Sequence, residues 1–245
     1  MRPVVGGDGG AVLEILSTGG IVQLDFEPMW LTLQVATIVT LVLLVVSTPL
    51  AWWLAFGKSR LRPLVEAVVA LPLLLPPTVL GFYLLVSFSP TGMFGAPWIA
   101  LMGQPLAFSF VGLVFASTIY NIPFVVQPLK AAFEAFGRDP LEAAWSLRAS
   151  PLDTFIHIAA PMALRGYLIA GVLCFAHAVG EFGVVLMVGG NIPGETRTLS
   201  IAIFNYVEQI RYLEAHIWAG SLLAFSFVAL VLLYGTQPRS LQQRR

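Results

Sequence analysis

Apolar residues run along this chain in five long blocks, separated by short segments that carry most of the charge and proline. Each block is about 20 residues long or longer, enough for a helix to cross the hydrocarbon core of a membrane. We therefore predict five membrane-spanning helices, near Trp30–Phe56, Leu64–Phe88, Leu106–Val126, Met162–Val188 and Ile217–Tyr234. The apolar stretch AVLEIL at residues 11–16 is too short to span, and it predicts a brief surface helix.

Composition supports a polytopic membrane protein. The chain has 245 residues, of which 58% are hydrophobic and only 11% are charged, whereas soluble domains carry about 25% charged residues. The net charge is zero, so the chain lacks the excess of basic residues that is typical of nucleic-acid-binding proteins. The single cysteine, Cys174, excludes an intramolecular disulfide and a cysteine-based metal site. Because the first 20 residues lack a continuous apolar stretch, we expect no cleavable signal peptide, and the first span must direct insertion.

The basic residues predict the orientation in the membrane. With five spans, ten of the 13 Lys and Arg residues fall on one side, which the positive-inside rule makes cytoplasmic. Only Arg2, Arg197 and Arg211 fall on the other side. The N-terminus is therefore expected outside and the C-terminus in the cytoplasm, since an even number of spans would scatter these charges.

The second predicted span contains a cluster of residues that interrupt helices. It holds Pro72, Pro76 and Pro77, and each proline removes a backbone donor and crowds the preceding turn. A broken helix is tolerated in a membrane where neighbouring helices or a water-filled cavity satisfy the freed carbonyls. Pro76 and Pro77 are therefore candidates for a pore or gate.

The fourth span carries the sequence His177-Ala-Val-Gly180-Glu181-Phe182-Gly183. A charged residue at bilayer depth costs about 2.5–3.5 kcal/mol, so Glu181 should face a cavity or a polar partner. We predict a helix bend at a gate here, with Glu181 bonded to backbone or hydroxyl groups of an adjacent helix and Phe182 able to plug the path. The alternative is that Glu181 reaches out to the membrane surface.

The charged segment EAAWSLRASPLDTFIHIAAP, residues 142–161, contains two helix starts. Gly137 suits the end of the preceding helix. Asp139 is followed by Pro140 and, three residues on, by Glu142, which predicts a capping box. Ser150 with Pro151 predicts a second start, and therefore a break near Arg148–Ala149.

The first of these two helices is too short to be stable alone, so it should dock against something. Ala143 and Ala144 would let a partner backbone approach, and Leu141 and Trp145 could fill a hydrophobic groove. The alternative is that the segment folds back on its own membrane helices.

This segment resembles the cytoplasmic loop of permease subunits in binding-protein-dependent ABC importers. The resemblance rests on the sequence EAA, followed by a turn and then by I-x-x-P. The resemblance implies a coupling helix that sits in a groove of an ATP-hydrolysing subunit, through Leu141, Glu142, Ala143, Ala144, Trp145 and Arg148. The chain departs from the family in two places. The family usually has glycine three residues beyond EAA, where Arg148 stands, and Leu-Pro where this chain has Ala160-Pro161.

Two further segments resemble molybdate permeases of the ModB type. They are Gly180–Phe204, with the sequence GEFGVVLMVGGNIPGETRTLSIAIF, and ALPLLLPPTVLGFYLL in the second span. The likeness runs from about residue 29 to 236. It implies an all-α membrane protein with the five-span, MetI-like fold of type I ABC importers. The transmembrane domain would cover residues 29–236, with the EAA loop at about 137–161, after an outer N-terminal segment (1–28) and before a cytoplasmic tail (237–245).

The resemblance also implies partners. Two copies of the permease would work with two ATP-binding subunits, which hold ATP and Mg²⁺, and with a periplasmic molybdate-binding protein. The bacterial cytoplasmic membrane is the implied location, and this chain would carry no cofactor, metal or catalytic site. The loop NIPGETRT lies outside and offers Asn191, Gly194, Glu195 and Arg197 for docking of the binding protein. The alternative is a merely solvated loop.

Other functions stay open on the residues alone. Sulfate and thiosulfate permeases share EFG and a related GNI loop, although they are usually longer, and tungstate resembles molybdate in shape and charge. A self-contained secondary transporter needs ion-coupling residues or inverted repeats, and neither is found. An intramembrane enzyme needs paired catalytic groups, and only His177 and Glu181 come close.

Overall fold

The computed structural model describes residues 14–17 and 20–235. It begins with an antiparallel hairpin of β1 (Glu14–Ser17) and β2 (Gly20–Gln23). The surface helix predicted from AVLEIL is therefore wrong over residues 14–16, and residues 11–13 lie outside the described part. The β-branched residues of GIVQ favour an extended chain, and pairing with this strand satisfies the backbone of residues 14–17.

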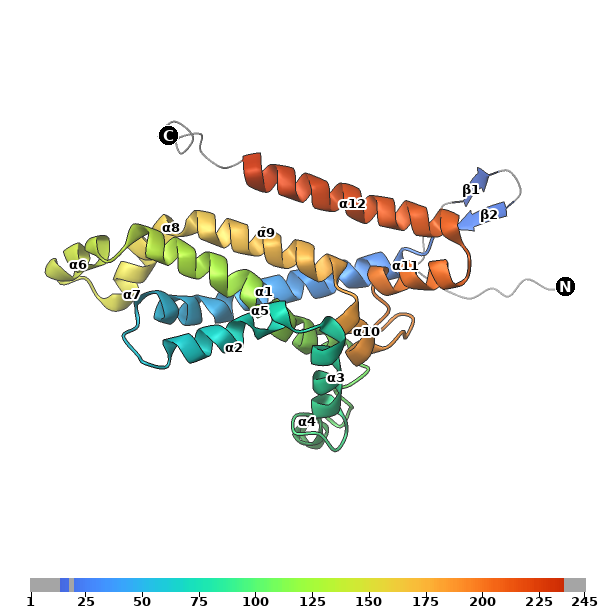
Figure 1. Ribbon diagram of the computed structural model, residues 1–245, viewed down its shortest axis with the longest axis horizontal. Helices are drawn as coiled ribbons and strands as arrows, with labels where there is room; N and C mark the ends of the chain where they lie inside the picture. The colour runs from blue at the N-terminus through green and yellow to red at the C-terminus, as the bar shows by residue number, and fades with distance from the viewer. Residues whose placement is uncertain (1–13, 18–19, 236–245) are drawn as a thin grey trace.

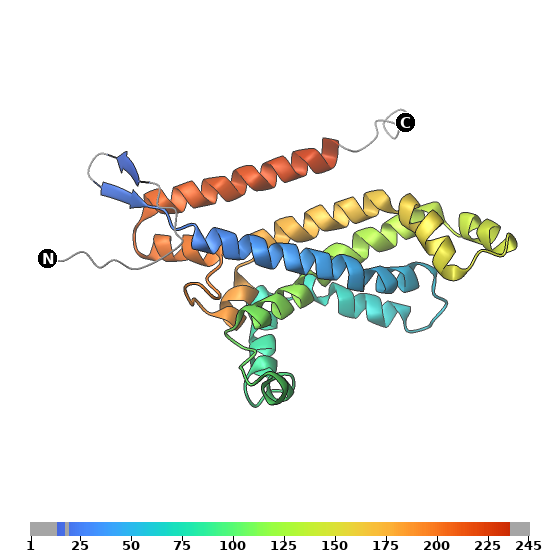
Figure 2. The same ribbon diagram turned by 180° about the vertical axis from the view of Figure 1, so that it is seen from behind.

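Three long helices pack together as the core of the molecule: α1 (Glu27–Phe56), α5 (Phe110–Phe136) and α9 (Leu164–Gly180). They lie side by side in both ribbon views (Figures 1 and 2). Leu43, Leu129 and Phe133 are fully buried between them, and so is Cys174. Buried apolar side chains from the three helices form one core cluster.

The second apolar block forms two helices, α2 (Arg62–Leu74) and α3 (Pro77–Phe88), which meet at an angle of 110°. Leu75 and Pro76 between them are extended, with ψ near 138° and 134°. The predicted break is thus confirmed. Two successive prolines, Pro76 and Pro77, disfavour the helical conformation in Leu75 and Pro76. Together with α4 (Gly95–Met102), α3 forms an arm that projects sideways from the bundle (Figure 1).

A chain of short helices connects α5 to α9. It consists of α6 (Asp139–Ser146), α7 (Pro151–Thr154), the π-helical turn η1 (Phe155–Ala159) and α8 (Ala160–Met162). The stretch Pro151–Met162 meets α9 at 68°. These elements lie at the end of the molecule where α1 ends and α2 begins (Figures 1 and 2). We call this the α6 end, and the opposite one the hairpin end.

The described chain ends with α10 (Gly183–Gly189), α11 (Leu199–Glu208) and α12 (Tyr212–Gly235). The predicted fourth span is split, because α9 stops at Gly180 and α10 follows as a separate short helix. α12 contains the predicted fifth span. It packs on α9 and α11 and leaves Leu223 and Phe227 exposed.

By length and apolar composition, α1, α5 and α12 can each cross a membrane. The number of such spans in the described residues rises to at most five if each of two bent pairs, α2 with α3 and Pro151–Met162 with α9, counts as one. The predicted class, a helical membrane protein, is confirmed, while five crossings as the exact number stays a prediction.

Candidate functional site

The EAA segment begins differently from the sequence-based expectation. Gly137 does end α5, with φ of 70°. However, the residue before the first turn of α6 is Arg138, and Asp139 is already helical with no side-chain cap bond. The predicted capping box is therefore wrong. Proline at the second helical position is compatible with this shift, because the first helical amides need no intrahelical partner.

The break after α6 lies where it was predicted. The helix ends at Ser146, and Arg148 adopts the left-handed conformation with φ of 61°. Residues with a Cβ pay a steric penalty in the left-handed conformation. This explains why glycine suits the position of Arg148 in the resembled family. The second predicted start is also confirmed, since the Ser150 side chain accepts a hydrogen bond of 3.1 Å from the Asp153 amide.

Burial divides the EAA segment into an anchored face and an open face. Leu141 is 1% exposed and Ala144 is also buried within this chain, so Leu141 is not available to fill a partner's groove as expected. Glu142 and Ala143 are exposed, and Trp145 is 46% exposed. Sequence reasoning missed Leu147 and Leu152, which are exposed on either side of the break; large apolar residues next to a helix break were the available signal.

A second constellation lies where α9 breaks. Glu181 stands between α9 and α10 and is only 4% exposed. Its Oε2 accepts hydrogen bonds from Ser117 Oγ (2.5 Å) and Asn121 Nδ2 (3.0 Å), both on α5. Asn121 Oδ1 in turn lies 2.9 Å from His177 Nδ1. The bond from a hydroxyl group of an adjacent helix was predicted, whereas a Glu181 that reaches out to the membrane surface is excluded by its burial.

The network also connects to α11 and to an aromatic neighbour. The Ser200 hydroxyl donates to the Glu181 carbonyl oxygen. The His177 ring stacks on Phe124, with ring centroids 3.9 Å apart. Sequence reasoning singled out His177 and Glu181, but it missed Ser117, because nothing local marks a serine 64 positions away as the partner.

The break after α9 places α10 directly against α3. A Cβ on Gly183 would lie 2.7 Å from Pro77 Cβ, and one on Gly81 would lie 2.8 Å from Met187 Cβ. Both distances are below any normal contact, so only glycine permits this crossing at these two positions. Of the predicted gate residues, Gly183 thus contacts Pro77, with Pro76 in the adjacent break, whereas nothing lies within 4 Å of a Cβ placed on Gly180. Phe182 packs against the bundle core, with its ring 5.2 Å from that of Phe204.

At the hairpin end, the loop between α10 and α11 folds against α11. Arg197 Nε donates to Asn191 Oδ1 (2.9 Å), and Asn191 and Asn205 exchange hydrogen bonds of 3.0 and 3.1 Å. Gly194 and Glu195 are exposed at the tip of the loop. The four predicted docking residues therefore share one surface.

A polar pocket of about 480 Å³ opens beside this loop, and Asn191 and Arg197 line it together with Asp25, Asn205 and Arg211. Arg211 Nη2 lies 2.7 Å from Glu214 Oε1, and its guanidinium lies 5.0 Å from the Tyr206 ring centroid. Both arginines are thus held in place by neighbours of this chain. The pocket offers fixed charges of both signs, suited to polar recognition of a partner surface.

Comparison with known proteins places these features in context. The family model described as "Binding-protein-dependent transport system inner membrane component" matches residues 47–244. The Molybdenum transport system permease protein ModB of Azotobacter vinelandii is 54% identical over 213 residues, which cover 87% of this chain and 94% of that protein. ModB of Escherichia coli (strain K12) is 34% identical over 184 residues, covering 75% and 80%.

Further similarities extend to a sulfate permease and to a solved structure. A probable sulfate transport system permease protein cysT of Nephroselmis olivacea is 34% identical over 202 residues, covering 82% of this chain and 71% of that protein. Among solved structures, a bacterial ABC transporter involved in the import of the acidic polysaccharide alginate aligns with a TM-score of 0.64. That alignment covers 90% of this chain and 80% of the other at 16% identity, so it supports the fold alone.

Proposed function

The chain belongs to the family of inner-membrane components of binding-protein-dependent transport systems, and on that premise we propose that it is the permease subunit of an ATP-driven importer of molybdate. One observation carries the substrate: the 54% identity to a molybdenum permease over nearly its whole length. Tungstate should be an equivalent cargo, because both are tetrahedral dianions of similar size.

A second candidate function is sulfate or thiosulfate import, supported by the 34% identity to a sulfate permease. The difference between 54% and 34% over similar lengths favours molybdate. Sulfate is also a tetrahedral dianion, so the permease core alone does not separate the two.

The proposed topology has five crossings of the bacterial cytoplasmic membrane. In it the α6 end faces the cytoplasm and the hairpin end faces outward. Ten of the 13 basic residues then fall on the cytoplasmic side, as the positive-inside rule requires. The pairs α2 with α3 and α7–α8 with α9 each count as one bent crossing in this scheme.

Two copies of the chain form the translocation path in this proposal. The space between α1, α5 and α9 is filled by side chains, so the path runs along the surface of this bundle, and a second copy closes it. Two separate ATP-binding subunits supply the energy and hold ATP with Mg²⁺. This chain is a transport subunit without its own catalytic step.

We assign the alternating-access mechanism to two groups of residues, the EAA segment before α9 and the Glu181 network at the break after α9. The exposed face of the EAA segment, with Glu142, Ala143, Trp145 and Arg148, docks on the ATP-binding subunits. Their closure moves α6, and rigid-body motion then changes the crossing of α3 and α10. Glu181 holds the broken end of α9 to α5, and a carboxyl group there is a poor ligand for a dianion. We therefore assign Glu181 to the gate, and we assign high-affinity binding of the oxyanion to the separate binding protein.

The binding protein docks on the hairpin end in this proposal, at the loop of Asn191, Gly194, Glu195 and Arg197 and the pocket beside it. The Arg197→Glu variant should weaken docking several-fold and leave the basal ATPase activity of the complex unchanged, because the loop is far from the EAA segment. Equal docking affinity of both forms, measured with the purified complex, would leave this surface without a role in docking.

The experiment for the substrate uses the complex of this chain with its ATP-binding subunits and binding protein, reconstituted in lipid. ATP hydrolysis is measured with molybdate, tungstate, sulfate and thiosulfate in turn. Stimulation by molybdate and tungstate is expected. Stimulation by sulfate or thiosulfate alone would favour the second candidate, and no stimulation by any oxyanion would contradict the proposal.

A further inference from the structure

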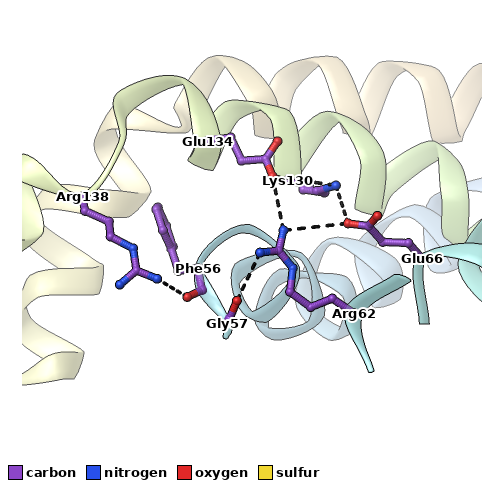
Figure 3. Close-up of polar contacts among 7 residues, drawn as sticks. All are labelled: Phe56, Gly57, Arg62, Glu66, Lys130, Glu134 and Arg138. Atoms are coloured by element: carbon purple, nitrogen blue, oxygen red, sulfur yellow. Dashed lines mark hydrogen bonds and ion pairs between the residues drawn. The ribbon is translucent and has the colours of Figure 1, made fainter. Parts of the chain in front are cut away.

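Four charged side chains form an ionic joint between α2 and α5 at the α6 end (Figure 3). Arg62 and Glu66 come from α2, and Lys130 and Glu134 come from α5. Lys130 Nζ hydrogen-bonds to Glu66 Oε1 and lies 3.7 Å from Glu134 Oε1. Arg62 Nη2 lies 3.9 Å from Glu66 Oε1 and 3.7 Å from Glu134 Oε1. Each cation thus lies between the same two carboxylates.

Two arginines also bind the end of α1. Arg62 Nη1 donates to the Gly57 carbonyl oxygen (3.1 Å), and Arg138 Nη2 donates to that of Phe56. The Arg138 guanidinium also lies 5.8 Å from the Phe56 ring centroid. The last carbonyls of a helix lack intrahelical donors and carry the negative end of its dipole. Arg138 directly precedes α6, so one side chain ties the start of α6 to the end of α1.

Aromatic rings also pack between the helices at this end of the molecule. The Trp52 ring of α1 lies 5.2 Å from that of Phe133 on α5 and 5.5 Å from that of Phe155 in η1, between centroids. The Phe56 ring lies 5.9 Å from that of Phe136. α1, α5 and η1 are therefore in direct contact through packed rings at the end of the molecule where α6 lies.

We propose that Arg138 and the ionic joint are positioning residues that transmit movement of α6 to α1 and α2, and through α2 and its break to the crossing of α3 with α10. This rests on the proposed function, in which ATP-binding subunits move α6. Exposed ion pairs contribute little to stability, and these side chains are 24–45% exposed. Alternating charges across two helices instead fix their register, and that is what transmission requires.

The test uses the complete complex in proteoliposomes and measures oxyanion moved per ATP hydrolysed. Lys130→Glu would place a third carboxylate beside Glu66 and Glu134, with only Arg62 to balance them. We expect this ratio to fall about tenfold, within the usual range of coupling between sites. The same loss is expected for Glu66→Lys. The double variant restores the central pair and should recover the ratio to within about threefold of wild type.

Arg138 is tested in the same assay. Arg138→Ala should lower the ratio, and Arg138→Lys should recover part of it, because a lysine can still donate to the Phe56 carbonyl. Arg60→Ala is the matched control, since Arg60 is an exposed cation in the same loop as Gly57 and outside the joint. This control should keep the wild-type ratio.

Assembly of the complex and thermal midpoints are measured for every variant. A purely structural role predicts lower stability with an unchanged ratio in the complexes that assemble, and that result would overturn the proposal. Single variants with the wild-type ratio, or a double variant no better than the single ones, would also overturn it while leaving the proposed function intact. A wild-type complex that moves no oxyanion would instead overturn the proposed function, and this inference with it.

Discussion

Replacing Glu181 with glutamine or alanine separates two roles of its side chain at the broken end of α9. Glu181→Gln keeps an oxygen where Oε2 accepts bonds from Ser117 and Asn121. The new amide nitrogen would take the place of Oε1, which has no hydrogen-bond partner among the described residues, so one buried polar atom stays unpaired in either form. Glu181→Ala removes the acceptor altogether.

The expected cost of the alanine variant follows from these contacts. Asn121 Nδ2 also loses its bond to Glu181 but keeps those to the Ser117 carbonyl oxygen (2.8 Å) and to Ser117 Oγ (3.3 Å). Ser117 Oγ is the donor that is left without its acceptor. A buried donor left unpaired costs about 1–3 kcal/mol, and the vacated volume adds about 1 kcal/mol. Glu181→Ala should therefore destabilise the fold by about 2–4 kcal/mol, and Glu181→Gln by less than about 1 kcal/mol.

Thermal unfolding of the purified protein in detergent, followed by tryptophan fluorescence, measures both effects. A loss of about 2–4 kcal/mol lowers the midpoint by about 4–16 °C for a chain of this size. The control is Glu208→Ala, because Glu208 is exposed at the end of α11. Equal losses for the two Glu181 variants, or no loss for alanine, would refute the assigned hydrogen bonds. In the transport assay, Glu181→Gln should keep binding-protein docking but change the ATP hydrolysed per oxyanion moved.

Three further substitutions test other parts of the structure. Gly183→Ala should destabilise the fold by about 1–3 kcal/mol, because the new Cβ would lie 2.7 Å from Pro77 Cβ. Its matched control is Gly220→Ala in α12, where nothing lies within 4 Å of the new Cβ. Equal thermal midpoints of these two variants would rule out the close crossing of α3 and α10. Arg148→Gly should stabilise the fold by about 1 kcal/mol, because Arg148 has φ of 61°, and a midpoint at or below that of wild type would contradict this reason. Ala143→Trp should abolish transport and co-purification with the ATP-binding subunits while the chain stays folded, since Ala143 is exposed; normal uptake would exclude the docking role.

Local chemistry in the sequence predicted the local features of the fold. The apolar blocks indicated the helices, Pro76 and Pro77 indicated the break in the second block, and Ser150 indicated the start of α7. The break within the EAA segment was predicted correctly, but its first cap was not. Asp139 and Ser150 both precede a proline, and only Ser150 caps its helix. The sequence alone does not say which of two similar caps forms when the preceding residue, here Arg138, is held by α1.

Contacts between distant segments could not be predicted from the sequence in the same way. Leu141 was expected to face a partner, but tertiary packing inside this chain buries it. The bond between Ser117 and Glu181 and the close approach of Gly183 to Pro77 depend on the angle at each break. The pair Pro76–Pro77 indicates that a helix ends there, but the direction of the next helix depends on what it packs against.

The central claim is that this chain is the permease of a molybdate importer, and uptake of radiolabelled molybdate into proteoliposomes that hold the complete complex tests it most directly. Uptake should require ATP and the binding protein, and excess tungstate should compete for it while excess sulfate should not. Uptake without ATP, or radiolabelled sulfate taken up in preference to molybdate, would contradict the account.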